Sequence, residues 1–328
     1  MQRKVSVAPM MDCTDRHERY FLRLISKNTL LYTEMIVSEA IDRGDKEKLL
    51  AFNINEKPLA LQLGGSSPKL LANAAKLGEN FGYDEINLNL GCPSKKVQKN
   101  KFGACLMKEP NLVGDCINEM KNSCNLPITI KTRIGYDEVE DYKYLKKFLT
   151  VINGAGSKTF IIHARRAILD KLTPKQNLNI PPLNYNFVYD VKKDFNDNTV
   201  ILNGGVDSID KIKTHLKKVD GVMLGRVAYH SPYFLAEVER EIFDNDNVLT
   251  RAEVMEQMVP YIKQETKKGI RLNQIMRHTI GLFHGQKGSS CWKRYLSENM
   301  CIRQADLQKV NHIMDYIKNN NSVTSLGR

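Results

Sequence analysis

The chain has no arrangement of cysteines typical of a metal site or of a disulfide framework. Its seven cysteines are odd in number and include no Cys-x-x-Cys pair, so neither structural bridges nor a zinc site is indicated. We therefore expect no bound metal. Reduced thiols are typical of the cytoplasm, which is the location that we predict for this protein.

Long apolar runs are also lacking. The apolar segments have the length of strands, and none approaches the roughly 20 residues of a membrane span or the apolar region of a signal peptide. The sequence predicts a globular protein without membrane contact, and 42% hydrophobic residues are enough for a core. No feature indicates a stable protein partner, so we expect a monomer.

Acidic residues are scarce relative to basic ones. The chain carries 37 Asp and Glu against 49 Lys and Arg, a formal net charge of +12, which favours a polyanionic partner. A lysine-rich, solvated helix surface is the alternative explanation. The excess concentrates in the basic stretch from Lys263 to Arg303, which has two acidic residues, Glu265 and Glu298. Its nine basic residues are Lys263, Lys267, Lys268, Arg271, Arg277, Lys287, Lys293, Arg294 and Arg303.

Eight short apolar segments alternate with stretches of helical spacing such as Pro68–Phe81. Alternating strands and helices pair in parallel, and eight such units make a (β/α)8 TIM barrel. The alternative, a doubly wound sheet, typically has a glycine-rich dinucleotide-binding motif after its first strand. The chain reads APMMDCTD there, which does not match that motif. The predicted strand segments are Val5–Met11, Leu30–Val37, Pro58–Gly65, Asp84–Pro93, Ile128–Gly135, Thr159–Arg166, Thr199–Val206 and Gly221–Ala228.

After residue 240 the β-branched runs stop and only helical periodicity remains. We therefore predict an α/β barrel domain over residues 1–240 and an appended all-α domain over residues 241–328. The helices expected in the second domain are Arg251–Lys268, Asn273–Phe283, Cys291–Asn299 and Asp306–Asn319.

The segment Asp84–Leu106, DEINLNLGCPSKKVQKNKFGACL, holds the strongest chemical signal. Its strand ends in Asn87, Asn89 and Cys92, and Pro93 stops it. Cys92 could be a buried small hydrophobic residue, as free cysteines often are. Four lysines follow it, however, and they would favour thiolate character and proton exchange at an electropositive rim; they are Lys95, Lys96, Lys99 and Lys101.

Other predicted strands also end in polar or glycine-rich sequence, and in a barrel of this kind the carboxyl ends of the strands build the functional face. Two glycine turns, Asn203-Gly204-Gly205 and Gly225-Arg226, indicate a phosphate site, although each alone could serve only as a tight turn. Lys131 would be partly desolvated, which suits a reduced flavin ring. His163 could donate to the same ring or be a core histidine.

Several motifs occur in the order seen in tRNA-dihydrouridine synthases, and the chain resembles this family over almost its whole length. They are APMMDCTDRHER, LYTEMI, LALQLGG, DEINLNLGCPS with GACL, IKTRIG, FIIHAR, NGGV and GVMLGR. The YTEMI motif, the loop Arg165–Leu183 and WKRYLSEN resemble the branch that modifies positions 20 and 20a. The resemblance implies reduction of D-loop uridines in tRNA by FMN, with NADPH or NADH as a transient reductant.

The resemblance also implies roles for individual residues. Cys92 would donate a proton to C5 of uracil while flavin N5 delivers hydride to C6, and Asn89 would contact the target nucleotide. The FMN-binding residues would be Pro9, Met10, Met11, Gln62, Lys131, His163, Asn203, Gly204, Gly205, Gly225 and Arg226. Further candidates for tRNA contact are Lys95, Lys99, Arg165, Arg166, Thr173, Gln176, Lys293 and Arg294.

Two other functions remain open from the sequence. A small-molecule FMN oxidoreductase of the dihydroorotate dehydrogenase kind would explain Lys131 and the phosphate site, but not the basic C-terminal domain. An RNA-binding module that uses the barrel as a scaffold would explain the charge, but it would leave Cys92, Lys131 and His163 without a purpose.

Overall fold

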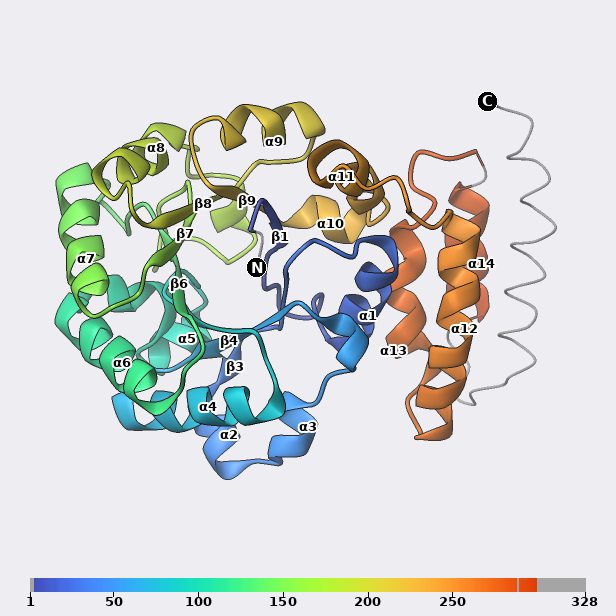
Figure 1. Ribbon diagram of the computed structural model, residues 1–328, viewed down its shortest axis with the longest axis horizontal. Helices are drawn as coiled ribbons and strands as arrows, with labels where there is room; N and C mark the ends of the chain where they lie inside the picture. Colours follow the sequence, from blue (N-terminus) through green and yellow to red (C-terminus); the bar gives the residue numbers. More distant parts are fainter. Residues whose placement is uncertain (1–2, 288, 300–328) are drawn as a thin grey trace. The chain divides into compact units, whose positions relative to one another are not determined.

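The computed structural model describes residues 3–287 and 289–299, and a ring of parallel strands forms the centre of its barrel (Figure 1). The strands are β1 (Val5–Val7), β2 (Leu31–Tyr32), β3 (Ile36–Val37), β4 (Leu59–Gly64), β5 (Glu85–Asn89), β6 (Ile128–Arg133), β7 (Thr159–His163), β8 (Thr199–Asn203) and β9 (Gly221–Leu224). Their order is β1-β9-β8-β7-β6-β5-β4-β2, and β3 also pairs with β4.

The ring closes between β1 and the residue that leads into β2. Ser6 and Leu30 form a parallel bridge. The Val7 N–H donates to the Leu30 carbonyl (2.9 Å), and the Leu30 N–H donates to the Val5 carbonyl (3.2 Å). Because β2 and β3 both pair with β4, they share the position of one predicted strand, Leu30–Val37. The predicted (β/α)8 TIM barrel is confirmed.

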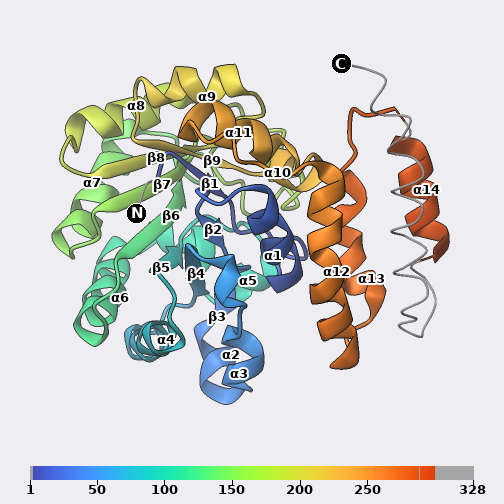
Figure 2. The ribbon, with the colours of Figure 1, turned by 45° about the vertical axis from the view of Figure 1, so that its right-hand side comes forward.

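Helices surround the strand ring (Figure 1; Figure 2). In α4, Ser67 caps the first turn, Pro68 occupies it, and Gly82 ends the helix with a φ of 90°. A Cβ on Gly78 would lie 2.6 Å from Ile86 Cδ1, so this glycine lets the helix approach β5 closely. The principal outer helices are α4 (Pro68–Phe81), α6 (Pro110–Ser123), α7 (Tyr142–Gly154), α8 (Tyr185–Asp194) and α9 (Ile209–Leu216).

Shorter helices lie in the connections of the barrel. Those that concern the strand ends are α5 (Lys95–Lys99) and the 3-10 helices η2 (Gly103–Lys108) and η3 (Gln176–Leu178); the others are α2 (Ser38–Arg43), α3 (Lys46–Leu50) and η1 (Ile54–Glu56).

The barrel interior contains an apolar cluster and a column of polar side chains. Asn89 Nδ2 donates to Gln62 Oε1 (2.8 Å), Gln62 Nε2 to Asn87 Oδ1 (2.8 Å), Asn87 Nδ2 to Thr129 Oγ1 (2.9 Å), and Thr129 Oγ1 to Glu85 Oε1 (2.5 Å). We call these five buried residues the polar column. The apolar cluster consists of Ala8, Leu30, Tyr32, Ala60, Ile161, Ile201 and Met223.

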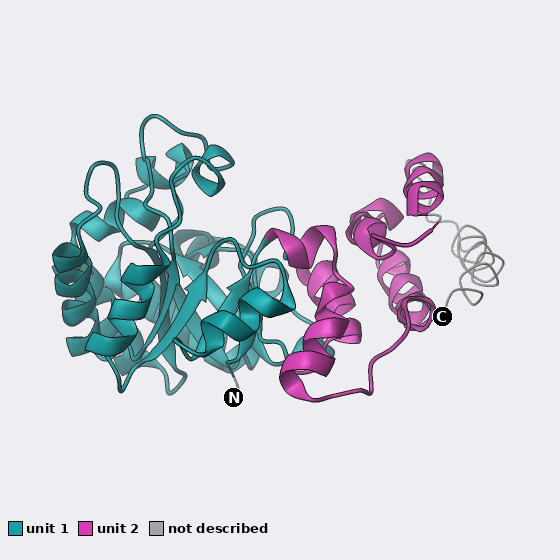
Figure 3. Ribbon diagram, turned by 90° about the horizontal axis from the view of Figure 1, so that it is seen from above, with its two compact units in different colours: residues 1–14, 29–225 teal, residues 15–28, 226–328 magenta. Residues whose placement is uncertain are grey.

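Contacts divide the chain into two compact units, which Figure 3 colours separately. Unit 1 is Met1–Thr14 with Thr29–Gly225, and unit 2 is Asp15–Asn28 with Arg226–Arg328. The described helices of unit 2 are α1 (Arg16–Ile25), α10 (Arg226–His230), α11 (Phe234–Phe243), α12 (Arg251–Lys267), α13 (Leu272–Met276) and α14 (Ser289–Asn299), with the 3-10 helix η4 (Arg277–Gly281). None of the described helices combines the length and apolar content needed to cross a membrane.

This division differs from the boundary predicted at residue 240, which falls within α11. Two of the helices predicted beyond residue 240 are confirmed: Arg251–Lys268 corresponds to α12, and Cys291–Asn299 corresponds to α14. The expected helix Asn273–Phe283 is instead α13 followed by η4. The expected helix Asp306–Asn319 and the basic residue Arg303 lie outside the described residues.

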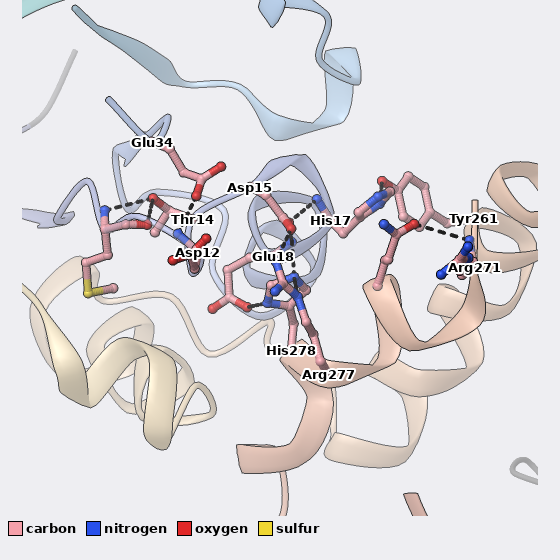
Figure 4. A network of polar contacts seen from close by, with 12 residues as sticks. Asp12, Thr14, Asp15, His17, Glu18, Glu34, Tyr261, Arg271, Arg277 and His278 are labelled. Atoms are coloured by element: carbon pink, nitrogen blue, oxygen red, sulfur yellow. Dashed lines mark hydrogen bonds and ion pairs between the residues drawn. The ribbon is translucent and has the colours of Figure 1, made fainter. Parts of the chain in front are cut away.

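Polar contacts explain why α1 belongs to unit 2 (Figure 4). His278 Nε2 lies 3.0 Å from Asp15 Oδ2, and its Nδ1 lies 3.0 Å from Glu18 Oε2. Arg277 Nη2 also pairs with Asp15 (2.7 Å). Burial lowers the pKa of His278, but its hydrogen bonds to the two carboxylates prevail and raise that pKa to about 9. A buried imidazolium thus joins α1 to η4.

We expect Arg3→Met to lower the free energy of unfolding by about 3–5 kcal/mol, because it leaves the buried Glu85 carboxylate without its cation. Glu85 would keep only the hydroxyls of Tyr32 (2.7 Å) and Thr129. Urea unfolding measures the difference, with Lys69→Met on the exposed side of α4 as a control for loss of charge. A loss no larger than that of the control would contradict the prediction.

Candidate active site

The polar column leads to the turn that carries Cys92. Asn89 Oδ1 accepts hydrogen bonds from the backbone N–H groups of Gly91 (3.1 Å) and Cys92 (3.0 Å). The Cys92 carbonyl accepts from the Ala104 N–H (2.9 Å). Gly103, with a φ of 77°, permits that approach, because a Cβ there would lie 2.7 Å from the Cys92 oxygen. The half-buried thiol is therefore held at a defined place beyond β5.

The surroundings of Cys92 do not favour the thiolate character that the following lysines suggested. Burial raises the pKa of the Cys92 thiol. A hydrogen bond from the Ser94 backbone, and then the charges of Arg133 and Lys131, oppose that effect without overcoming it. Lys95 and Lys99 are exposed on α5 and contribute nothing to the shift. A thiol whose pKa is raised holds its proton more firmly, which suits a proton donor better than a nucleophile.

Lys131 and Arg133 bring positive charge to the strand ends beside Cys92. Lys131 is the register partner of Asn89, and within residues 3–287 and 289–299 no carboxylate pairs with its ammonium group. Burial, and then the charge of Arg133, lower the pKa of Lys131 to about 7. An uncompensated ammonium group in this position favours a negatively charged or electron-rich ligand.

The sequence indicated Arg133 as a strand residue but not what it does. Its Nε donates to the Gly91 carbonyl (2.8 Å), and its Nη1 donates to the carbonyls of Arg166 (3.2 Å) and Asn177 (3.4 Å). Asn177 is fully buried and bonds the Ile168 backbone in both directions. The two residues tie the Cys92 turn to the loop after β7. No local pattern marked Asn177, because its partners are backbone groups within an irregular loop.

The glycine turn after β8 also has the features expected of an anion site. Gly204 and Gly205 both have positive φ values, 112° and 70°. A Cβ on Gly204 would lie 2.8 Å from His163 Cδ2, so the turn packs directly on the buried His163 ring. In the part of the chain that the structure describes, the N–H groups of Gly205 and Val206 have no protein acceptor. Such unpaired N–H groups suit a phosphate.

The remaining predicted cofactor residues lie at other strand ends. Asn203 is buried, and its Nδ2 donates to the Met223 carbonyl (2.8 Å). A Cβ on Gly225 would meet open space, and exposed Arg226 follows it at the start of α10. After β1, Pro9 and Met10 are half-buried and Met11 is 56% exposed. Unit 1 thus gathers Gln62, Lys131, His163 and the glycine turn at one end of the barrel.

Four residues predicted to contact tRNA have partners in the loops after β6 and β7. Arg165 Nη1 donates to the Asn179 carbonyl (3.4 Å) and to that of Pro181, and Arg166 Nε lies 3.5 Å from a Glu140 carboxylate oxygen. Exposed Thr173 and Gln176, the first residue of η3, form reciprocal hydrogen bonds. Lys293 and Arg294 are exposed on α14 of unit 2.

Among the described residues, a thiol, an ammonium group without a carboxylate partner and backbone N–H groups without acceptors lie at the strand ends of a parallel barrel, which is the end where barrel enzymes have their active sites. Residues 6–319 match the family model described as Dihydrouridine synthase (Dus). The chain therefore belongs to the dihydrouridine synthase family, and it is an oxidoreductase.

Relatives named tRNA-dihydrouridine(20/20a) synthase are similar over almost their full length. The protein from Synechocystis sp. is 49% identical over 302 residues, covering 92% of this chain and 90% of the relative. That from Vibrio parahaemolyticus is 52% identical over 298 residues, covering 90% and 91%. That from Escherichia coli K12 is 50% identical over 316 residues, covering 96% and 91%.

A solved structure of 2-naphthoyl-CoA reductase with 2-naphthoyl-CoA is similar in fold alone. The TM-score is 0.54 at 11% sequence identity, and the match covers 72% of this chain and 49% of that protein.

We expect Lys131→Met to stabilise the ligand-free protein near pH 6. The folded pKa of Lys131, about 7, lies below its unfolded value of roughly 10.4, so the unfolded chain binds more protons between these values and the parent gains stability as pH rises. The variant lacks this dependence. Its advantage, on the order of 1–4 kcal/mol at about pH 6, should vanish towards pH 10 in urea unfolding. A difference in the free energy of unfolding that does not depend on pH would contradict the lowered pKa of Lys131.

Proposed function

We propose that this protein reduces uridines 20 and 20a of the tRNA D-loop, with bound FMN and with NADPH or NADH as reductant. The observation that carries the proposal is that the Cys92 thiol, the Lys131 side chain, with which no described carboxylate pairs, and the free N–H groups of the glycine turn all lie at the same end of the barrel. The names and identities of the relatives support the positions 20 and 20a.

The residues at the strand ends fit FMN. Lys131 and His163 would face the ring, and Gln62 and residues 9–11 would border it, while Asn203–Gly205 and Gly225–Arg226 would hold the phosphate. When bound in its reduced form, FMN supplies hydride for C6 of uracil. A phosphate at the turn would give acceptors to the N–H groups of Gly205 and Val206, which have none in the described protein.

Cys92 would supply the proton at C5 of uracil. Its raised pKa keeps the proton on sulfur until the substrate is present. Arg133 and Lys131 both favour the thiolate that remains after transfer, so they lower the cost of the step. Asn89 uses Oδ1 for the Cys92 turn and one Nδ2 hydrogen for Gln62, which leaves its second Nδ2 hydrogen for a uracil oxygen.

The target base must leave the tRNA fold, which calls for a surface that grips the surrounding phosphates. Lys95 and Lys99 on α5 and Lys293 and Arg294 on α14 are exposed and positively charged. Arg165, Arg166, Thr173 and Gln176 would act through the loop after β7 that they brace. The cytoplasmic location and the monomeric state remain predictions.

Two measurements test the function. The purified protein should be yellow and release stoichiometric FMN, and tRNA from a strain without the gene should lack dihydrouridine at positions 20 and 20a. A different flavin, no flavin, or unchanged dihydrouridine at both positions would refute the proposal. Reduction of free uracil derivatives but not of tRNA would favour the small-molecule oxidoreductase instead.

We expect Cys92→Ala to slow tRNA reduction by about a hundred- to ten-thousand-fold, the usual contribution of a general acid. Reduction of the flavin by NADPH should be unaffected, because the thiol serves the uracil only. Cys105→Ala is the matched control: Cys105 lies in η2, where its thiol donates to the Phe102 carbonyl (3.1 Å), and most turnover should remain. Equal, small effects in single-turnover assays would remove Cys92 from the role of acid.

Reversing the charges of Lys293 and Arg294 to Glu should weaken tRNA binding without altering flavin reduction. Because each neutralised phosphate releases counterions, the plot of log affinity against log salt should become shallower by roughly one to two units. The matched control reverses Lys143 and Lys147, two exposed lysines one turn apart on α7. An unchanged slope would mean that the basic stretch is only a solvated surface.

A further inference from the structure

The glycine turn after β8 has both of its carbonyl groups held by side chains. The Tyr185 hydroxyl, from the first residue of α8, donates to the Gly204 carbonyl (3.0 Å). The Lys211 ammonium group, from α9, donates to the Gly205 carbonyl (3.3 Å). Two helices outside the strand ring therefore set the orientation of two successive peptide groups.

The orientation of each carbonyl determines that of the next N–H. In a trans peptide the C=O of one residue and the N–H of the following residue point in opposite directions, and both peptide bonds of this turn are trans. When Tyr185 holds the Gly204 carbonyl, the Gly205 N–H points away from Tyr185. When Lys211 holds the Gly205 carbonyl, the Val206 N–H likewise points away from Lys211. These are the two N–H groups that have no acceptor in the described protein.

Tyr185 is itself held in place. Its ring meets that of His215 edge to face at 4.6 Å, and buried His215 lies with Nδ1 2.8 Å from the Tyr189 hydroxyl. The Asn184 N–H donates to the Ala164 carbonyl (2.8 Å), which ties the start of α8 to the end of β7. Burial raises the pKa of Tyr185, so its hydroxyl keeps the proton that it donates. A Cβ on Gly205 would lie 2.7 Å from the Tyr185 oxygen, so only glycine permits this contact.

We propose that Tyr185 is a positioning residue for the flavin phosphate: by holding the Gly204 carbonyl it aims the Gly205 N–H at the phosphate. Lys211 has the same role, more weakly, for the Val206 N–H, because its ammonium group is half-exposed and also pairs with Asp207 (2.6 Å). The proposal rests on FMN as the cofactor. It goes further by assigning selection of the phosphorylated flavin to a side chain that acts through the backbone of the glycine turn.

The experiment compares FMN with riboflavin, which has the same ring and no phosphate. Flavin is removed from the protein, and both affinities are measured by quenching of flavin fluorescence for the parent and for Tyr185→Phe. We expect Tyr185→Phe to bind FMN roughly three- to tenfold more weakly, the effect of one neutral hydrogen bond, and riboflavin as the parent does. Lys211→Met should show a smaller loss of the same kind.

Tyr189→Phe is the matched control, because it removes a hydroxyl from the same helix that bonds His215 and not the turn. Its ratio of FMN to riboflavin affinity should equal that of the parent. Equal weakening of both flavins by Tyr185→Phe would assign Tyr185 a general structural role, and no weakening would overturn the inference outright. A parent that does not prefer FMN to riboflavin would instead overturn the proposed cofactor, and the inference with it. If Tyr185→Phe does not fold, Lys211→Met at its exposed site tests the same inference, through weaker binding of FMN and unchanged binding of riboflavin.

Discussion

The carboxylate of Glu85 is buried inside the barrel, and it is tolerated there because Arg3, Tyr32 and Thr129 surround it. Side chains alternate along a strand, so turning Glu85 inward also turns Asn87 and Asn89 inward. Asn89 then accepts the N–H groups that shape the Cys92 turn. A shift of β5 by one residue would expose the carboxylate to the helix layer and carry the thiol away from the strand ends.

Desolvation at the strand ends shifts the pKa values of two groups in opposite directions. It favours the neutral form of every ionisable group, so it raises the pKa of Cys92 and lowers that of Lys131. Lys131 and Arg133 are costly to the folded protein, and no carboxylate among the described residues compensates Lys131. The barrel gives up stability here, and an anionic ligand would restore it. At a strained or charged site of this kind, the residues that serve function lower the stability of the folded protein.

Much of this arrangement could be predicted from the sequence, because apolar alternation marks each strand and polar residues mark each strand end. Cys92, Lys131, His163 and the glycine turn were found in that way. Glu85 was not, although it shares a face of β5 with Asn87 and Asn89. The roles of Arg133, Asn177 and Tyr185 depend on carbonyl groups that are distant along the chain or that belong to an irregular loop, and periodicity carries no information about those. The same limit hid the grouping of α1 with the C-terminal helices.

The contact of α1 with η4 joins residues that are synthesised at very different times. Asp15 and His278 are 263 positions apart, so α1 leaves the ribosome long before its ionic partners are made. Throughout that interval Asp15 and Glu18 lack the His278 imidazolium that pairs with them, so α1 is without its ionic partners in unit 2. The ionic contacts of Asp15 within unit 2 therefore form only after residues 277 and 278 have been synthesised. A chain that stopped before residue 277 would contain the sequence of strands β1 to β9 but would lack both cationic partners of Asp15.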